Sequence, residues 1–147
     1  PENRPEFLAL KKAEHIAKSH PESVVIGADT AVFSDGEMLG KPKDERDAEN
    51  MLALLSGRTH KVITGCAMVK DNQKKSFSVI SEVTFYELTE KEIKEYVKTK
   101  EPLDKAGAYG IQGKGALLVK EIKGDYFNIV GLPVAELKRK LQDFTDE

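Results

Sequence analysis

The fold of this protein is organised around Val24-Val25-Ile26-Gly27-Ala28-Asp29-Thr30-Ala31-Val32-Phe33. The run is β-branched and nearly all apolar, which is typical of a strand buried on both faces. An ionised Asp29 in such a strand is costly unless its carboxylate is paired with a positive group or bound to a cation. Two hypotheses therefore stay open: a functional carboxylate, or a structural one that caps a neighbouring loop. Thr30 is a weaker candidate, because threonine is common in strands.

Helices are predicted on both sides of this strand. Before it, apolar residues at helical spacing predict a helix over residues 4–19 that stops at His20-Pro21. Its inward positions are expected to be Leu10, Ala13, Ile16 and Ala17. After a turn at Ser34-Asp35-Gly36 and an extended loop at Gly40-Lys41-Pro42, Asp44 is the expected N-cap of a helix that ends at Gly57. The apolar stripe of this second helix is Ala48, Met51, Leu52 and Leu55.

The rest of the chain is predicted to combine strands and helices. Strands over 60–69 and 76–88 are joined by a polar hairpin at 70–75, and Thr89-Glu90-Lys91-Glu92 is a capping box. The helix that follows turns Ile93, Tyr96 and Val97 inward. Next comes a glycine-rich loop over 102–115. It is followed by strands over 116–122 and 126–130, which are separated by the turn Gly124-Asp125, and by a last helix. That helix is expected to bury Val134, Leu137, Leu141 and Phe144. The prediction is one α/β domain over residues 1–147, with a mixed twisted sheet flanked by helices.

Composition excludes several classes of protein. The chain has 147 residues, 39% of them apolar, which suffices for one soluble domain with its own core. Cys66 is the only cysteine, so an intramolecular disulfide and Cys-based zinc clusters are excluded and a reducing, cytoplasmic location is expected. No run resembles a membrane span or a signal peptide. The formal net charge of −2 argues against a duplex-DNA binder, whereas a small anionic ligand held by a few lysines fits.

The glycine-rich loop and the remaining polar residues leave several alternatives open. The loop fails the Walker A pattern, because Lys114 is followed by Gly115 rather than by Ser or Thr. Its backbone either approaches a ligand, with Lys105 and Gln112 as polar arms, or forms a surface turn. Lys41 either contacts phosphate or is simply solvated. No histidine has a metal-ligand spacing, so His60 is expected to pack or make one hydrogen bond, and Cys66 to be a small buried apolar residue.

Five motifs occur along the chain in a fixed order. They are Gly27-Ala28-Asp29-Thr30, Gly40-Lys41-Pro42, Ser56-Gly57-Arg58-Thr59-His60 with Val62 and Thr64, Asp104-Lys105-Ala106-Gly107-Ala108-Tyr109-Gly110-Ile111-Gln112-Gly113, and Gly131-Leu132-Pro133. In this order they resemble the Maf family of nucleoside triphosphate pyrophosphatases, over essentially the whole chain. The resemblance implies an inosine-triphosphatase-like architecture and hydrolysis of dTTP or UTP to the monophosphate and pyrophosphate. It also implies a role in nucleotide pool sanitation, a link to septum formation, and a divalent cation, Mg²⁺ or alternatively Mn²⁺.

The resemblance also implies roles for individual residues. Asp29 is implied to be the catalytic acid–base residue and a ligand of the cation. Lys12 and Lys41 are implied to bind the phosphates of the substrate, and Lys105 is a further candidate for substrate binding. Thr30 and Gln112 resemble the branch that prefers dTTP and UTP over 7-methyl-GTP. A glutamine amide offers both the donor and the acceptor that the imide edge of a pyrimidine requires.

One departure from the family pattern is large. Members begin with a strand, a Ser-x-Ser-Pro-Arg-Arg loop, a helix and a Glu-bearing strand, which this sequence lacks, so the chain is expected to be N-terminally truncated. The missing arginines and glutamate would bind phosphate and the cation. An alternative is therefore a non-catalytic nucleotide-binding or regulatory module, and another is an interaction domain whose motifs are relics. The expected partners are a nucleoside triphosphate and a second copy of the chain, with no nucleic acid and no membrane.

Overall fold

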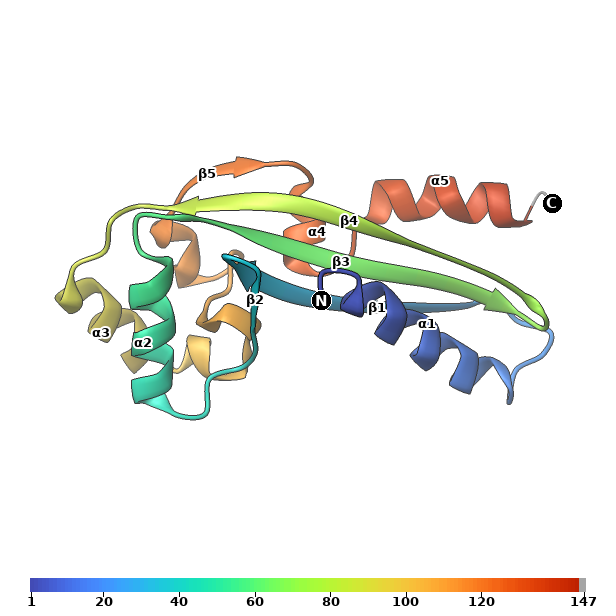
Figure 1. Cartoon of the computed structure of the whole chain (residues 1–147), viewed down its shortest axis with the longest axis horizontal. Helices are drawn as coiled ribbons and strands as arrows, with labels where there is room; N and C mark the ends of the chain where they lie inside the picture. The colour runs from blue at the N-terminus through green and yellow to red at the C-terminus, as the bar shows by residue number, and fades with distance from the viewer. Residues whose placement is uncertain (146–147) are drawn as a thin grey trace. The chain divides into compact units, whose positions relative to one another are not determined.

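The computed structural model describes residues 1–145 and confirms an α/β fold with one sheet flanked by helices (Figure 1). The strands lie in the order β2-β1-β3-β4-β5, and the β1–β2 and β4–β5 pairs are antiparallel. Their bounds are β1 Val25–Ser34, β2 Glu37–Leu39, β3 Thr59–Lys70, β4 Gln73–Phe85 and β5 Val119–Lys123. The α-helices are α1 Arg4–Ala17, α2 Glu45–Leu55, α3 Glu90–Lys98, α4 Tyr126–Val130 and α5 Val134–Thr145. Three 3₁₀-helices are η1 Glu101–Asp104, η2 Ala106–Ala108 and η3 Lys114–Leu118.

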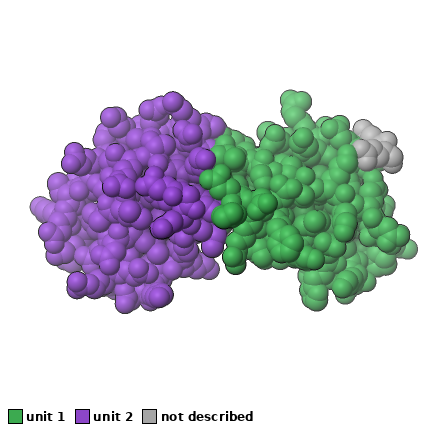
Figure 2. Space-filling model, viewed as in Figure 1, with its two compact units in different colours: residues 1–30, 63–80, 125–147 green, residues 31–62, 81–124 purple. Residues whose placement is uncertain are grey.

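The chain forms two compact units, coloured separately in Figure 2. Unit 1 contains residues 1–30, 63–80 and the described residues from 125 onward, and unit 2 contains residues 31–62 and 81–124. Strands β1, β3 and β4 each contribute residues to both units. Within the described residues, no helix is long and apolar enough to cross a membrane.

In unit 1, helices cover the two faces of β3. Ala67 and Val69 point to one face, where they pack against the alanines of α1, Ala9, Ala13 and Ala17. Cys66 and Met68 point to the other face, where they pack against Leu137 and Phe144 of α5. This alternation follows from the period of two residues along a strand. Cys66 is fully buried in this core, as predicted.

Helix α1 approaches the sheet closely because two strand positions have no side chain. A Cβ added at Gly27 of β1 would lie 2.4 Å from the carbonyl oxygen of Ala9. A Cβ added at Gly65 of β3 would lie 2.1 Å from the backbone nitrogen of Glu6. Glycines on the strands and alanines on the helix together bring the two backbones into contact.

In unit 2, the predicted helix starts are confirmed. The Asp44 carboxylate accepts a hydrogen bond from the backbone N–H of Asp47 and caps α2. Thr89 and Glu92 form both hydrogen bonds of the capping box at α3. Ile93, Tyr96 and Val97 are buried, as expected.

The predicted strand over 126–130 is wrong, because these residues form helix α4. Its sequence is rich in apolar residues that suit a strand, but the Asp125 carboxylate accepts from the N–H of Phe127 and starts a helical turn. Gly131, with φ of 132°, ends that turn. Upstream, η3 occupies residues that were predicted to begin a strand, and β5 starts only at Val119.

Smaller corrections concern element ends and exposed apolar residues. The hairpin turn between β3 and β4 has two residues rather than six, and β4 ends at Phe85 rather than at residue 88. Strand β2 was not predicted, and the predicted loop over 102–115 contains the short helices η1 and η2. Ile16 and Val134, expected inside, are 50% and 46% exposed, since Ala9 takes the core position on α1 and Leu137 and Phe144 take those on α5. Ile26 is also exposed, so the first half of β1 is not buried on both faces.

Candidate functional site

The first group of predicted site residues lies in unit 1, where Asp29 pairs with Lys12. Lys12 Nζ donates to Asp29 Oδ1 at 2.9 Å. The close packing of α1 on Gly27 brings the lysine, one helical turn from Ala9 and beside Ala13, within reach of β1. The Asp29 side chain is 22% exposed and that of Lys12 is 60% exposed. The carboxylate therefore has its charged partner, and both groups remain accessible to water or to a ligand.

A hydroxyl network holds the residue that follows Asp29. Thr30 Oγ1 lies 2.8 Å from Thr64 Oγ1 and 3.3 Å from the carbonyl oxygen of Gly131, and its single proton is donated to one of these two oxygens. Thr64, which is completely buried, donates to the carbonyl oxygen of Asn128 at 3.1 Å. These bonds join β1 and β3 to the end of α4 and fix the backbone beside Asp29. Sequence reasoning quoted Thr64 in a motif but did not identify it as a member of the site.

The second group lies in unit 2, where the Lys41 and Lys105 loops meet. The N–H of Gly107 donates to the carbonyl oxygen of Gly40 at 3.1 Å. Gly107 has φ of +75°, and an added Cβ would lie 3.1 Å from Val32, so this contact requires glycine. Lys105 Nζ lies 3.1 Å from Asp104 Oδ1.

Charge links the two lysines of this group. The hydrogen bond and charge of Lys105, with a further contribution from Lys41, hold the pKa of Asp104 below its ordinary value. Lys41 itself is exposed and has no hydrogen-bond or ion-pair partner among residues 1–145. Asp104 was not predicted to be a site residue, although it directly precedes Lys105 in the fourth sequence motif. The group is a cationic surface with one carboxylate, which suits a phosphate-bearing ligand.

Gln112 lies in unit 2 on the loop between η2 and η3. Its side chain is exposed and makes no hydrogen bond within the part of the chain that the structure describes. The structure therefore brings Lys12, Asp29 and Thr30 together in unit 1, and it brings Lys41 and Lys105 together in unit 2, which also carries Gln112.

Comparison with known proteins identifies the family. The Maf-like protein family matches residues 1–144. The chain belongs to the Maf family. A dTTP/UTP pyrophosphatase of Bacillus cytotoxicus is 57% identical over 137 residues, which cover 93% of this chain and 72% of that protein. The dTTP/UTP pyrophosphatases of Bacillus pumilus and Bacillus velezensis are each 54% identical over 144 residues, covering 98% of this chain and 76% of theirs.

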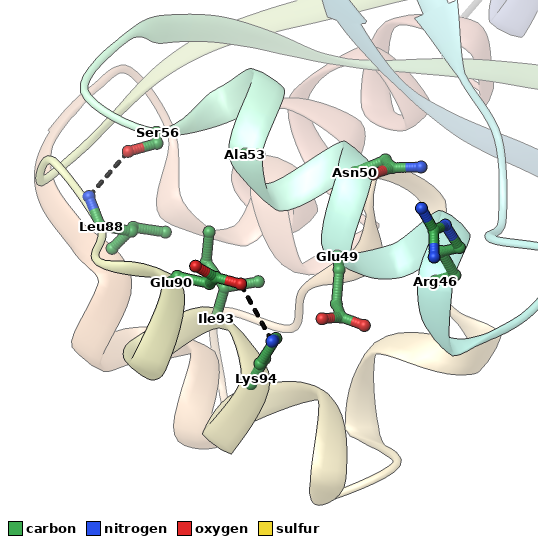
Figure 3. Close-up of a pocket in the computed structure, with 9 residues that line it drawn as sticks. All are labelled: Arg46, Glu49, Asn50, Ala53, Ser56, Leu88, Glu90, Ile93 and Lys94. Atoms are coloured by element: carbon green, nitrogen blue, oxygen red, sulfur yellow. Dashed lines mark hydrogen bonds and ion pairs between the residues drawn. The ribbon is translucent and has the colours of Figure 1, made fainter.

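A pocket of this Maf protein is lined by none of the predicted site residues. It has a volume of about 560 Å³ and lies between α2 and α3 in unit 2 (Figure 3). Arg46, Glu49 and Asn50 line it from α2, and Glu90, Ile93 and Lys94 from α3. Glu90 and Lys94 neutralise each other at 2.9 Å. No residue predicted to be catalytic or substrate-binding lines this pocket, so the pocket gives no support for catalysis.

The described residues of this Maf protein offer few protein ligands for a metal ion. Among residues 1–145, no group of three or more His, Cys, Asp or Glu side chains is placed to hold a metal ion. Asp29 Oδ2 has no hydrogen-bond partner in the same residues, because Lys12 contacts Oδ1. Magnesium in nucleotide enzymes is often bound by one or two carboxylates together with substrate phosphates and water. Asp29 fits that type of site as its single carboxylate.

Proposed function

We propose that this chain is a nucleoside triphosphate pyrophosphatase that hydrolyses dTTP and UTP. The observation that carries the proposal is the Asp29–Lys12 pair, which is accessible in the middle of strand β1 in a chain more than half identical to dTTP/UTP pyrophosphatases. An accessible carboxylate beside an ammonium group can bind water and contact phosphate oxygens at the same place.

In the proposed reaction, Asp29 accepts a proton from a water molecule. The water oxygen attacks the α-phosphorus, and the bond from that phosphorus to the oxygen bridging the β-phosphate breaks. The products are the nucleoside monophosphate and pyrophosphate. Lys12, Lys41 and Lys105 offset the negative charge of the phosphates, because each presents an ammonium group from an exposed or half-buried position.

We propose Mg²⁺ as the cation, with Mn²⁺ as the alternative. Nucleotide pyrophosphatases of the Maf family are generally metal-dependent. Asp29 would contribute its free carboxylate oxygen, and the bound cation would offset phosphate charge. We further propose that the enzyme is cytoplasmic and forms a homodimer, the commonest symmetric assembly. Sedimentation of the purified chain tests the second point.

Base preference is proposed to depend on Thr30 and Gln112. The unpartnered Gln112 amide can donate to and accept from the imide edge of uracil or thymine. The Thr30 hydroxyl is already bonded to Thr64 and Gly131, so a contact with substrate would replace one of these bonds.

Pyrophosphate release tests the proposal. The chain is assayed with Mg²⁺ against dTTP, UTP, CTP, GTP and 7-methyl-GTP, and dTTP and UTP are expected to be the best substrates. Asp29→Asn should lower kcat by on the order of 10²- to 10⁴-fold, the usual contribution of a general base. Asp35→Asn is the matched control, because Asp35 follows the same strand, is exposed and, among residues 1–145, pairs only with Arg58. An Asp29→Asn variant as active as the parent would remove Asp29 from the mechanism.

The panel also separates the alternatives. A folded parent chain that releases no pyrophosphate from any nucleotide contradicts the enzymatic proposal. Calorimetric binding of dTTP by that inactive chain would instead support a nucleotide-binding or regulatory module. Absence of both turnover and binding would leave an interaction domain as the better explanation.

A further inference from the structure

The glycine-rich loop of unit 2 surrounds a carboxylate that belongs to the protein itself. Glu101 accepts hydrogen bonds from the Tyr96 hydroxyl at 2.8 Å, from the N–H of Lys114 at 3.0 Å and from the N–H of Gly115 at 3.2 Å. The Tyr96 hydroxyl oxygen in turn accepts from the N–H of Gly110 at 3.0 Å. Two side chains therefore hold the backbone at both ends of the 110–115 segment.

The glycines of this segment make room for the two side chains. A Cβ added at Gly113 would lie 2.5 Å from Glu101 Oε2, and one added at Gly115 would lie 2.7 Å from the Tyr96 hydroxyl. A Cβ at Gly110 would lie 2.6 Å from Lys105 Cε and 3.1 Å from Glu101 Oε1. The N–H groups of Lys114 and Gly115 are not free to bind a phosphate, because they already donate to Glu101.

The electrostatics of Glu101 agree with this geometry. Partial desolvation raises the pKa of Glu101, but the hydrogen bonds from Tyr96, Lys114 and Gly115 and the charge of Lys105 outweigh it and hold the pKa below its ordinary value. The carboxylate is thus ionised at neutral pH and makes charge-assisted hydrogen bonds, which are stronger than neutral ones. Burial raises the pKa of Tyr96, so its hydroxyl stays protonated and donates to Glu101.

Gln112 lies between the backbone N–H groups of Gly110 and Lys114, which these hydrogen bonds hold in place. Gly110 precedes it by two residues, and Lys114 follows it by two. Its own side chain is exposed and makes no hydrogen bond within residues 1–145. A side chain without its own contacts is positioned only by its backbone, and that backbone is held by Glu101 and Tyr96.

We propose that Glu101 and Tyr96 are positioning residues that orient Gln112 and thereby set the preference for pyrimidine over purine nucleotides. The inference rests on the proposed function. Neither residue touches substrate in this arrangement; each acts through the backbone of residues 110–115. Chemistry at Asp29 does not depend on the two residues, so they affect substrate selection rather than the rate of bond cleavage.

Two variants from opposite sides of the cluster test this proposal. Glu101→Gln keeps the size of the side chain but replaces one accepting oxygen with an NH₂ group, which cannot accept from a backbone N–H. Tyr96→Phe removes the hydroxyl that links Glu101 to Gly110. Glu95→Gln is the matched control, because Glu95 is the neighbouring exposed residue on α3 and, within the described part of the chain, makes only a 3.9 Å pair with Lys91. Thermal unfolding of each variant verifies that it is folded.

The measured quantity is the ratio of kcat/KM for dTTP to kcat/KM for GTP. We expect Glu101→Gln and Tyr96→Phe to lower this ratio by about tenfold, the effect of losing one hydrogen bond of ordinary strength, through a higher KM for dTTP with kcat nearly unchanged. Glu95→Gln should keep the ratio of the parent. Adding Glu101→Gln to Gln112→Ala should change the ratio no further than Gln112→Ala alone, since both act through one contact.

The outcomes separate this inference from the proposed function. If the folded parent hydrolyses no nucleotide, the proposed function is wrong and the inference falls with it. If the parent is active and both folded variants keep its ratio, or if Glu101→Gln lowers kcat equally for every nucleotide, the positioning role is wrong while the proposed function stands. If one variant fails to fold, the other decides.

Discussion

His60 is a buried ionisable side chain of unit 2 with a defined partner and a defined pKa change. It is 2% exposed, and its Nε2 lies 2.6 Å from the Tyr109 hydroxyl. Its ring packs edge-on against those of Phe85 and Tyr109. Desolvation by burial lowers the pKa of His60 from 6.5 to about 4. Its role here is structural, and the prediction that it packs or makes one hydrogen bond is confirmed.

This histidine predicts how stability depends on pH. Between about pH 6.5 and pH 4, the unfolded chain protonates His60 while the folded chain does not, so the unfolded state binds more protons and the free energy of unfolding falls as pH is lowered. The full contribution is about 3 kcal/mol. Urea unfolding at several pH values measures this dependence. The free energy of unfolding should change less steeply with pH in His60→Gln than in the parent.

A second histidine provides the control for this slope. His15 on α1 is exposed, so His15→Gln should keep the slope of the parent across the same pH window. Equal slopes in the parent and in His60→Gln would contradict the assignment of this pH dependence to His60.

At the scale of the element, the contact between α1 and β1 depends on Gly27. An added methyl group would meet the Ala9 carbonyl oxygen at 2.4 Å and Ala13 Cβ at 3.2 Å, so α1 must move away from the strand. Gly27→Ala is expected to lower the free energy of unfolding by about 1–3 kcal/mol, as overpacking usually does. It should also lower kcat, because the shift of α1 moves Lys12 away from Asp29.

Thermal or urea unfolding and pyrophosphate release measure the two effects. Gly40→Ala is the control for stability, since an added methyl group there meets no atom within 4 Å. A Gly27→Ala variant as stable as Gly40→Ala would show that α1 has room to move without loss of packing.

At the scale of the whole molecule, Cys66 is a reporter of unfolding. It is the only cysteine, it is fully buried in the core between β3 and α5, and burial, with a contribution from Glu136, raises the pKa of its thiol to about 11. A thiol reagent at pH 8 is therefore expected to leave the native chain unmodified and to modify one thiol per chain in denaturant. The modified fraction, measured by mass spectrometry, follows opening of this core. Rapid modification of the native chain would contradict the packing of α5 on β3.

Sequence patterns were enough to predict the features that depend on residues close together in the chain. Four such features depend on side chains within a few positions of one another. They are the helical spacing before His20-Pro21, the Asp44 cap, the Thr89–Glu92 capping box and the apolar run around Asp29. The sequence also identified Cys66 as a core residue and required a partner for Asp29. The ordered motifs pointed to the Maf family, to which the chain belongs. Residues 126–130 show the limit of local patterns, because apolar content there suited a strand while the Asp125 cap started a helix.

Contacts between residues far apart in the chain could not be predicted from sequence patterns and came from the packing of the folded chain. Lys12 reaches Asp29 because Gly27 lets α1 pack closely on β1. Thr64 lies beside Thr30 because β1 and β3 are neighbouring strands. The side chain of Glu101 occupies space that a Cβ at residue 110 or 113 would need, and that of Tyr96 does so at residue 115. Ile16 and Val134 stay exposed, although their spacing suited a core position, because other residues of the same helices face the sheet. Each of these contacts depends on how closely two backbones approach, and that distance is set by packing between segments far apart in the chain.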